Sequence, residues 1–492
     1  MVEREWTEEG NDAAGVSLAA TLPGARFVGC DDVVARRCTV EAARCRPGDV
    51  FVARPTGDGD GHEEAALAVA RGAAAVVAER MVPTHGAPLC IVPDSTWALA
   101  RLAHACAGDP ARRLVVIAVA GTSGKTTTAW LTASVLAEAG IRVGVLSDLG
   151  CLDAEASLPE AADLERPQVL AAWLRRLAVS GCTHAVVEVS SGMLAAHALA
   201  GVACDTVVVT NVATAHLDRH GTPAAYRGLL RRAVGSLAPS GCLVFDADDR
   251  RACRLAARHR GPTVAAALRA PADVTAVPVE QSLGGRTILV AAGGHTAAVA
   301  LATPTSSFVR DALLAAAVGL RQAVPLERVC RGLEAAGSVP GRMERLDCGQ
   351  DAAVFLDRAS SGHALSSALA SLRRLTPGRL VLVAEEEAAA AVAPAGPFAA
   401  RAGRWCDDVL VVPSTVLDEH AGSDAVAAYA RVDRLLSRTG RDDCVLVLGR
   451  PPAGGGTSGD PGDPAASGPL ARLVEGWLRL VHPAERGGRR AA

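Results

Sequence analysis

The chain contains one lysine, Lys125, and the residues around it could bind phosphate. It lies in the segment GTSGKTTT, which runs from Gly121 to Thr128. In a loop of this kind the backbone N–H groups point at an anion, and lysine adds a mobile charge for the β- and γ-phosphates. The Thr126 hydroxyl can coordinate Mg²⁺. The segment therefore predicts a nucleoside triphosphate site. Its predicted binding residues are Gly121, Thr122, Ser123, Gly124, Lys125, Thr126 and Thr127.

The sequence on either side of this loop has the order that such a site needs. An apolar run of strand length, 114–120, leads into the loop, and a helical pattern covers 129–139. The alternative is a chance Gly-rich turn, and a strict G-x4-G-K-[ST] pattern would have glycine where this chain has Val119. The strand before the loop and the helix after it favour the phosphate site.

Polar residues also follow two later apolar runs. Glu188 comes after 184–187, and His216 comes shortly after 205–209. Open α/β sheets bind their ligands at the carboxyl ends of the strands, and a carboxylate with an imidazole can hold a divalent cation there. Taken alone, Glu188 could be a surface charge at a strand end and His216 a structural histidine. Beside a phosphate loop, we interpret both as catalytic and metal-binding residues.

Apolar runs of strand length alternate with Ala/Leu-rich helical patterns along the chain. This pattern predicts an α/β fold with mainly parallel sheets. Breaks in the pattern near 107–112 and 337–340 divide the chain into three predicted domains, 1–112, 113–340 and 341–492. We expect strands at 408–412 and 444–448, a loop at 451–469 and a final helix at 470–480.

Bulk composition excludes several functions. The formal net charge of −3 gives no electrostatic footprint for nucleic acid. The 14 cysteines form no C-x-x-C pair and indicate reduced thiols. No apolar run resembles a membrane span or a secretory signal, so we expect a cytoplasmic protein. Four histidines in Ala/Leu-rich surroundings are predicted to be structural or surface groups. They are His104, His184, His197 and His363.

Four segments together carry a resemblance to a known family. They are GTSGKTTT at 121–128, EVSS at 188–191, TN-x4-HLD-x-HGT at 210–222 and VPGRME at 339–344. These segments, in this order, resemble the Mur ligase family, most closely its UDP-N-acetylmuramoyl-tripeptide synthetase branch. The resemblance covers most of the chain. It implies a three-domain architecture with a UDP-substrate domain, a central P-loop ATPase domain with a parallel sheet, and a Rossmann-like C-terminal amino-acid domain.

The resemblance also implies an activity. The cofactors would be ATP and Mg²⁺, and the partners would be a small-molecule carboxylate and an amine. The carboxylate attacks the γ-phosphate of ATP, and the amine then converts the acyl phosphate into an amide, with peptidoglycan precursor synthesis as the implied setting. Carried over residue by residue, Lys125 is catalytic, Thr126 holds one Mg²⁺, and Glu188 and His216 serve a second. ATP would also contact Asn211 and Arg342, and the UDP-muramoyl substrate would contact Ser190.

The chain departs from the family pattern at several positions. The family has a carbamylated lysine four residues after Tyr226, where this chain has Leu230. The other departures concern substrate and nucleotide contacts. Gly192 replaces a histidine, Glu165-Arg166-Pro167 replaces Thr-Thr-Pro, and Phe308 and Asp311 replace asparagines.

Three hypotheses follow from this combination. The first is an ATP-dependent amide ligase with altered substrates. The second is a catalytically impaired nucleotide-binding protein with a regulatory or partner-binding role. The third is a folded relic that binds nothing.

Overall fold

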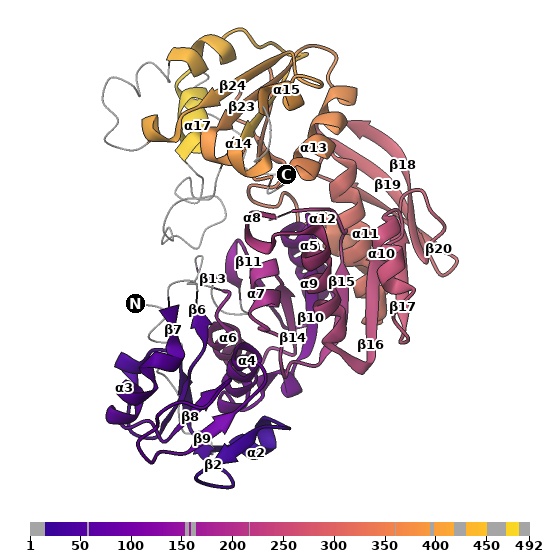
Figure 1. The fold of residues 1–492 in the computed structure, drawn as a ribbon. Coiled ribbons are helices and arrows are strands. Elements are labelled where there is room, and N and C mark those ends of the chain that lie inside the picture. The colour runs from indigo at the N-terminus through magenta and orange to yellow at the C-terminus, as the bar shows by residue number, and fades with distance from the viewer. Residues whose placement is uncertain are drawn as a thin grey trace.

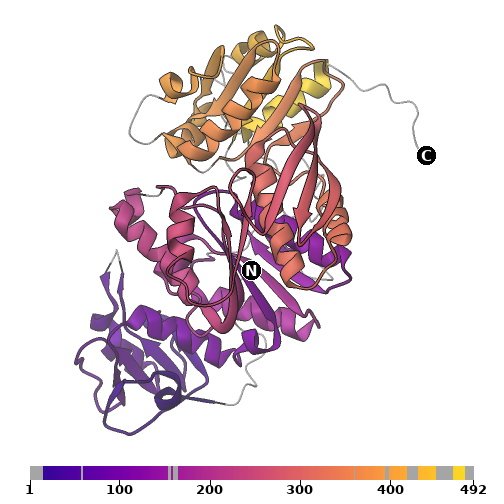
Figure 2. The same ribbon diagram turned by 90° about the vertical axis from the view of Figure 1, so that its right-hand side faces the viewer.

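The computed structural model has an α/β fold organised around three large sheets. Figure 1 shows them in chain order, from the indigo N-terminal part through the magenta and red centre to the orange and yellow C-terminal part, and Figure 2 shows the same order from the side. The structure describes residues 15–56, 59–152, 157–158, 164–215, 217–359, 361–393, 398–417, 430–449 and 469–481.

The N-terminal sheet has five strands in the order β2-β9-β8-β5-β4. Four of them are parallel, and β2 pairs with β9 in the antiparallel direction. Apolar residues of α4 pack on this sheet, including Ala98, Leu99 and Leu102. The elements are β2 (Arg26–Val28), β4 (Arg37–Thr39), β5 (Asp49–Val52), β8 (Ala75–Ala78), β9 (Leu89–Ile91), α2 (Leu18–Thr21), α3 (Ala65–Ala70) and α4 (Ser95–Cys106).

The central sheet has eleven strands, and the strand before the phosphate loop lies inside it. β10 (Val115–Ala120) pairs in parallel with β14 (His184–Glu188) on one side and with β15 (Cys204–Val209) on the other. The carboxyl ends of these strands therefore meet at one edge. The remaining strands are β11 (Val143–Ser147), β12 (Gly150–Leu152), β13 (Ser157–Leu158), β16 (Leu237–Asp246), β17 (Thr263–Ala267), β18 (Val274–Ser282), β19 (Gly285–Ala292) and β20 (His295–Leu301).

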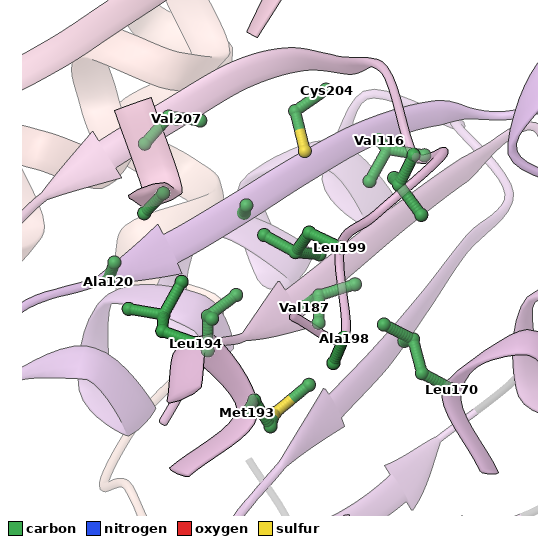
Figure 3. Close-up of a cluster of buried hydrophobic side chains, with 14 of the residues drawn as sticks. Val116, Ala120, Leu170, Val187, Met193, Leu194, Ala198, Leu199, Cys204 and Val207 are labelled. Carbon is green, nitrogen blue, oxygen red and sulfur yellow. The ribbon is translucent and has the colours of Figure 1, made fainter. Parts of the chain in front are cut away.

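Helices cover both faces of the central sheet and form two separate cores. One face is covered by α5 (Lys125–Glu138), α11 (Ser306–Arg321) and α12 (Leu326–Ala335). The other is covered by α6 (Pro167–Val179), α7 (Ser191–Ala195), α9 (Pro223–Gly235) and α10 (Arg250–Ala256). In this second core, Met193 and Leu194 of α7 belong to the same cluster of buried side chains as Val187 and Leu170 (Figure 3). The short helix α7 is thus anchored by buried side chains.

The C-terminal sheet has five strands in the order β21-β22-β25-β23-β24. All pair in parallel except β21, which pairs with β22 in the antiparallel direction. The elements are β21 (Glu344–Leu346), β22 (Ala353–Asp357), β23 (Leu380–Glu385), β24 (Asp408–Val412), β25 (Cys444–Leu448), α13 (Gly362–Leu375), α14 (Glu386–Val392), α15 (Phe398–Ala402) and α17 (Pro469–Val481).

The predicted α/β class and the predominance of parallel pairing are confirmed, as are the strands β24 and β25. One prediction was wrong in detail, because the helix after the loop begins at Lys125 and not at 129. The antiparallel strands β18 to β20 were not predicted. The turn between β19 and β20 contains Gly293-Gly294, whose positive φ angles are typical of a hairpin. Residues 451–468 of the predicted loop at 451–469 lie outside the described part of the chain. The domain boundaries stay a prediction.

In the parts of the chain that the structure describes, no helix combines the length and the apolar character needed to cross a bilayer.

Candidate functional site

The phosphate loop connects β10 to α5, and its backbone requires glycine at two positions. Gly121 and Gly124 have φ angles of +149° and +81°, which other residues rarely adopt. A Cβ at Gly121 would lie 2.0 Å from Thr210 Oγ1, and a Cβ at Gly124 would lie 2.3 Å from Asp311 Oδ1. The loop therefore fits closely against β15 and α11, and this fit explains both glycines.

Residues at the end of β15 hold the loop from one side. Asn211 Oδ1 accepts a hydrogen bond from the Ser123 backbone N–H at 3.2 Å, and its Nδ2 donates to the Ser123 carbonyl at 2.9 Å. Thr210 Oγ1 donates to the same carbonyl at 2.6 Å. Asn211 was predicted to bind ATP, and in this structure its side chain fixes the loop that would do so.

The side chain of Thr122 supports the loop from the α9 side. Its buried hydroxyl accepts hydrogen bonds from the Ala213 backbone N–H at 2.9 Å and from the Tyr226 hydroxyl at 3.1 Å. These contacts tie the loop to α9. The contribution of Thr122 to a phosphate site would therefore come from its backbone.

Glu188 lies at the centre of the polar contacts around the loop. It ends β14 beside the loop and is only 3% exposed. Its Oε1 accepts a hydrogen bond from Thr126 Oγ1 at 3.1 Å and lies 4.0 Å from Lys125 Nζ, while its Oε2 accepts from the Asp148 backbone N–H at 3.0 Å. Burial and the nearby Asp148 carboxylate raise the pKa of Glu188, and the cations Lys125 and Arg342 lower it.

Arg342 reaches the loop from the segment that leads into the C-terminal sheet. Its Nη2 donates to Thr126 Oγ1 at 2.9 Å and lies 3.5 Å from Asp148 Oδ2, while its Nη1 donates to the Arg358 carbonyl at 2.9 Å. Burial raises the pKa of Asp357, whose Oδ1 accepts from the Met343 backbone N–H at 3.1 Å. A residue from the C-terminal part of the chain thus contacts the same hydroxyl as Glu188.

These residues open onto a cavity of about 460 Å³ between the central and C-terminal sheets. Its walls include the predicted residues Ser123, Gly124, Lys125, Thr126, Thr127, Glu188, Asn211 and Arg342. They also include Asp148, Asp246 and Arg358, which were not predicted from the sequence, and Phe308 and Asp311, which were identified from the sequence as departures from the family pattern. Asp148 and Asp246 lie at strand ends, the signal that identified Glu188. His363, predicted to be a structural or surface group, is exposed and lies in the cavity wall.

Two carboxyl groups in the cavity wall are strongly affected by burial. Burial raises the pKa of Asp246 to about 6, and Arg310, whose Nε lies 3.8 Å from Asp246 Oδ2, opposes this shift. Burial also raises the pKa of Asp311 well above its usual range. Burial therefore opposes ionisation of both carboxyl groups in the cavity wall formed by β16 and α11.

The residues around Thr126 suit a magnesium ion that is bound mainly by a nucleotide. A threonine hydroxyl and a carboxylate are hard oxygen donors, and Mg²⁺ commonly takes one or two such protein ligands plus phosphate oxygens and water. Among the described residues there is no cluster of three or more His, Cys, Asp or Glu side chains placed to hold a metal. Thr126 and Glu188 fit this arrangement, and His216 lies outside the described residues.

Two further positions bear on the predicted site. The Ser190 hydroxyl accepts a hydrogen bond from the Met193 backbone N–H at 3.0 Å and caps α7, so its predicted substrate contact stays a prediction. Leu230, at the position of the expected lysine, is 2% exposed and belongs to the core beneath α9. An apolar side chain therefore fills that place.

Known proteins resemble this chain over most of its length. Residues 119–319 match the family model described as the Mur ligase middle domain. The chain is also 33% identical to a UDP-N-acetylmuramyl-tripeptide synthetase of Roseiflexus sp. (strain RS-1), over 88% of this chain and 93% of that protein. The chain belongs to the Mur ligase family. A second relative of the family, the UDP-N-acetylmuramoyl-L-alanyl-D-glutamate–2,6-diaminopimelate ligase of Chlorobium phaeobacteroides, is 34% identical over 68% of this chain and 69% of its own.

Solved structures support the Mur ligase fold along most of the chain. A UDP-N-acetylmuramoyl-L-alanyl-D-glutamate–2,6-diaminopimelate ligase matches with a TM-score of 0.66 and 19% identity, over 88% of this chain and 93% of that one. The MurF ligase from Thermotoga maritima in complex with ADP matches with a TM-score of 0.59 and 18% identity, over 90% and 96%. At these identities the likeness concerns the fold.

Proposed function

We propose that this chain is an ATP-dependent ligase that joins a small-molecule carboxylate to an amine. The observation that carries the proposal is the convergence on the Thr126 hydroxyl. The phosphate loop supplies this hydroxyl, the central sheet supplies Glu188 at 3.1 Å, and the segment leading into the C-terminal sheet supplies Arg342 at 2.9 Å. A ligase needs these parts together, because ATP and both substrates must meet at one place.

Each of these groups has a role in the proposed reaction. The loop N–H groups and Lys125 bind the β- and γ-phosphates, and Arg342 adds positive charge where negative charge develops during phosphoryl transfer. Bound Mg²⁺ would neutralise phosphate charge beside Thr126 and Glu188. A carboxylate oxygen of the acid attacks the γ-phosphorus, and ADP leaves. The amine then attacks the acyl phosphate carbon, phosphate leaves, and loss of a proton from nitrogen gives the amide.

The names of the relatives suggest where substrate screening should begin. They include a muramyl-tripeptide synthetase and ligases that join UDP-N-acetylmuramoyl-L-alanyl-D-glutamate to 2,6-diaminopimelate. We propose the same general chemistry for this chain, in peptidoglycan precursor synthesis with altered substrates. The altered substrates are motivated by the departures at Gly192 and at Glu165-Arg166-Pro167, which lie outside the ATP cavity.

The test is ADP release and amide formation with UDP-N-acetylmuramoyl-L-alanyl-D-glutamate and a panel of amino acids and diamines. We expect substrate-dependent ADP release by the wild type. Lys125→Ala should lose about 10- to 100-fold in ATP affinity, since a charged hydrogen bond is removed. Lys125→Arg is the matched control that keeps the positive charge. It should restore little of the ATP affinity, because a guanidinium does not replace a compact ammonium in this loop. Equal ADP release by wild type and Lys125→Ala on every substrate pair would overturn the proposal.

A second candidate function is nucleotide binding without turnover, with a regulatory or partner-binding role. The observation that favours it is Leu230, whose burial in the core gives no polar group in place of the family's lysine. This candidate predicts that Mg-ATP raises the thermal midpoint while no substrate pair yields an amide. Steady amide formation would eliminate it. A folded relic, in turn, would show no thermal shift with Mg-ATP.

A further inference from the structure

An ion pair joins two segments next to the proposed catalytic residues. Glu165 lies just before α6, and Arg219 lies in α8 (Leu217–His220). Arg219 Nη1 donates to Glu165 Oε1 at 2.8 Å, and its Nη2 donates to Oε2 at 2.7 Å. The side chain of Arg219 is 52% exposed, and that of Glu165 is 37% exposed. This is the two-pronged geometry with which arginine binds a carboxylate.

The position of the Glu165 carboxylate depends on the absence of a side chain at Gly192. A Cβ at Gly192 would lie 1.8 Å from Glu165 Oε1 and 2.1 Å from its carboxyl carbon. Gly192 does not have the positive φ angle that would by itself require glycine, so its lack of a side chain is explained by the carboxylate beside it. The next residues, Met193 and Leu194, are buried in the core of Figure 3, so α7 cannot easily move away. The structure therefore contains a fitted place for this carboxylate.

This place lies on the side of the site that the nucleotide cavity does not use. Gly192 follows the catalytic candidate Glu188 by four residues, and Arg219 follows His216 by three. None of Glu165, Gly192 or Arg219 lines the cavity of about 460 Å³. Next to Glu165 in the chain, Arg166 has its Nη2 3.9 Å from Oε1 of Glu41, and Glu41 belongs to the N-terminal part of the chain. The pair thus lies between the phosphate site and the N-terminal sheet.

An acid substrate would have to approach from this side. Its reacting carboxylate must reach the γ-phosphate beside Thr126 and Glu188, while the proposed nucleotide lies in the cavity and Arg342 contacts Thr126 from the C-terminal side. The rest of the acid then extends past α7 and α8, whose contact is completed by His220 Nε2 and Ser191 Oγ at 2.9 Å. Arg219 presents its guanidinium at this place and already binds a carboxylate in the two-pronged geometry.

We propose that Arg219 binds a second carboxylate of the acid substrate, and that Glu165 occupies Arg219 until this substrate displaces it. The inference rests on the proposed ligase function and narrows its acid to molecules with a carboxylate besides the one that is activated. Displacement is feasible because an ion pair with this much exposure contributes little free energy. The exchange replaces one carboxylate by another and leaves no buried charge unpaired.

Three substitutions in the full-length protein separate the steps of this exchange. Glu165→Gln removes the competing charge. Gly192→Ala keeps both charged residues but pushes the Glu165 carboxylate out of its place. Arg219→Ala removes the proposed binding group. The probe is UDP-N-acetylmuramoyl-L-alanyl-D-glutamate, measured by isothermal titration in the presence of Mg-ADP, beside two analogues in which one or the other glutamate carboxylate is an amide.

We expect Glu165→Gln and Gly192→Ala to bind the probe about three- to fivefold more tightly, since they remove a weak competing ion pair. Arg219→Ala should weaken binding about tenfold or more, and the double variant Glu165→Gln/Arg219→Ala should show no gain. The analogue that lacks the carboxylate proposed to bind Arg219 should bind to all variants with the same affinity. If Gly192→Ala does not fold, Glu165→Gln carries the same test. Equal affinities of wild type, Glu165→Gln and Arg219→Ala would overturn the inference.

The binding measurement is independent of turnover, so the two proposals can fail separately. Amide formation by a protein whose variants all bind the probe alike would refute the role of Arg219 and leave the ligase function standing. The expected ranking of affinities without amide formation on any substrate pair would refute the ligase function and leave Arg219 as a carboxylate-binding residue.

Discussion

Replacing Gly124 by alanine should damage both stability and nucleotide binding, and the structure allows the two causes to be separated. The left-handed φ of +81° costs an alanine about 1 kcal/mol. The new Cβ would also lie 2.3 Å from Asp311 Oδ1, an overlap with a buried side chain that adds about 1–3 kcal/mol. Gly140 is a matched control, because its φ is +79° and a Cβ added there would have nothing within 4 Å.

Thermal unfolding with and without Mg-ATP measures both effects. Since about 1 kcal/mol shifts the midpoint of a unit of this size by about 2–4 °C, Gly140→Ala should lose that much and Gly124→Ala about 4–16 °C. ATP affinity should be unchanged in Gly140→Ala and at least tenfold lower in Gly124→Ala, because the loop N–H groups move. Adding Asp311→Ala should recover part of the loss in Gly124→Ala. Equal midpoints and ATP affinities for the two glycine variants would refute the reasoning.

Three further predictions concern single contacts. Arg342→Ala should slow ADP release about 100-fold while Mg-ATP still shifts the thermal midpoint, and an unchanged rate would remove Arg342 from the mechanism. Because burial raises the pKa of Asp246 to about 6, its ionisation opposes folding, so stability should fall as pH rises from about 4 to 6. Asp246→Asn should flatten this slope and be more stable by up to about 3 kcal/mol at pH 7 in thermal or urea unfolding; an identical pH profile would contradict this. Tyr226→Phe loses the hydrogen bond to Thr122 and should cost about 1 kcal/mol in urea unfolding, with ATP affinity within threefold of wild type.

Local signals in the sequence were sufficient for the phosphate loop. A strand, a glycine-containing loop and a helix are adjacent in the chain, so Gly121, Gly124 and Lys125 could be identified without knowledge of the tertiary structure. Glu188 was found because strand ends in parallel sheets face a common edge. Asp148 and Asp246 also follow or end strands of this sheet, so the same rule could have identified both from the sequence.

Other parts of the site depend on contacts between distant segments. Asp311 lies 187 residues after Gly124, and only the packing of α11 against α5 brings them together. His363 belongs to α13, next to the C-terminal sheet, and its Ala-rich neighbourhood gave no sign that it faces a cavity. Arg342 was identified through the family resemblance, since nothing near it in the sequence distinguishes it from the many other arginines. Contacts between segments that are distant in the sequence are not encoded in local periodicity.

The two glycines at the centre of these tests differ in what they imply about the departures from the family pattern. Gly124 is required by the backbone of the loop as well as by Asp311. Gly192 stands where the family resemblance predicts a histidine, and in the sequence it resembles the loss of a functional group. In the structure it provides the space for the Glu165 carboxylate, which Arg219 holds with two hydrogen bonds. Loss of function alone does not explain why Gly192 lacks a side chain where the Glu165 carboxylate fits and Arg219 binds that carboxylate. The three residues together therefore favour a reorganised acid-binding site over a folded relic, and a Gly192→Ala variant that matched the wild type in stability and in probe affinity would refute this conclusion.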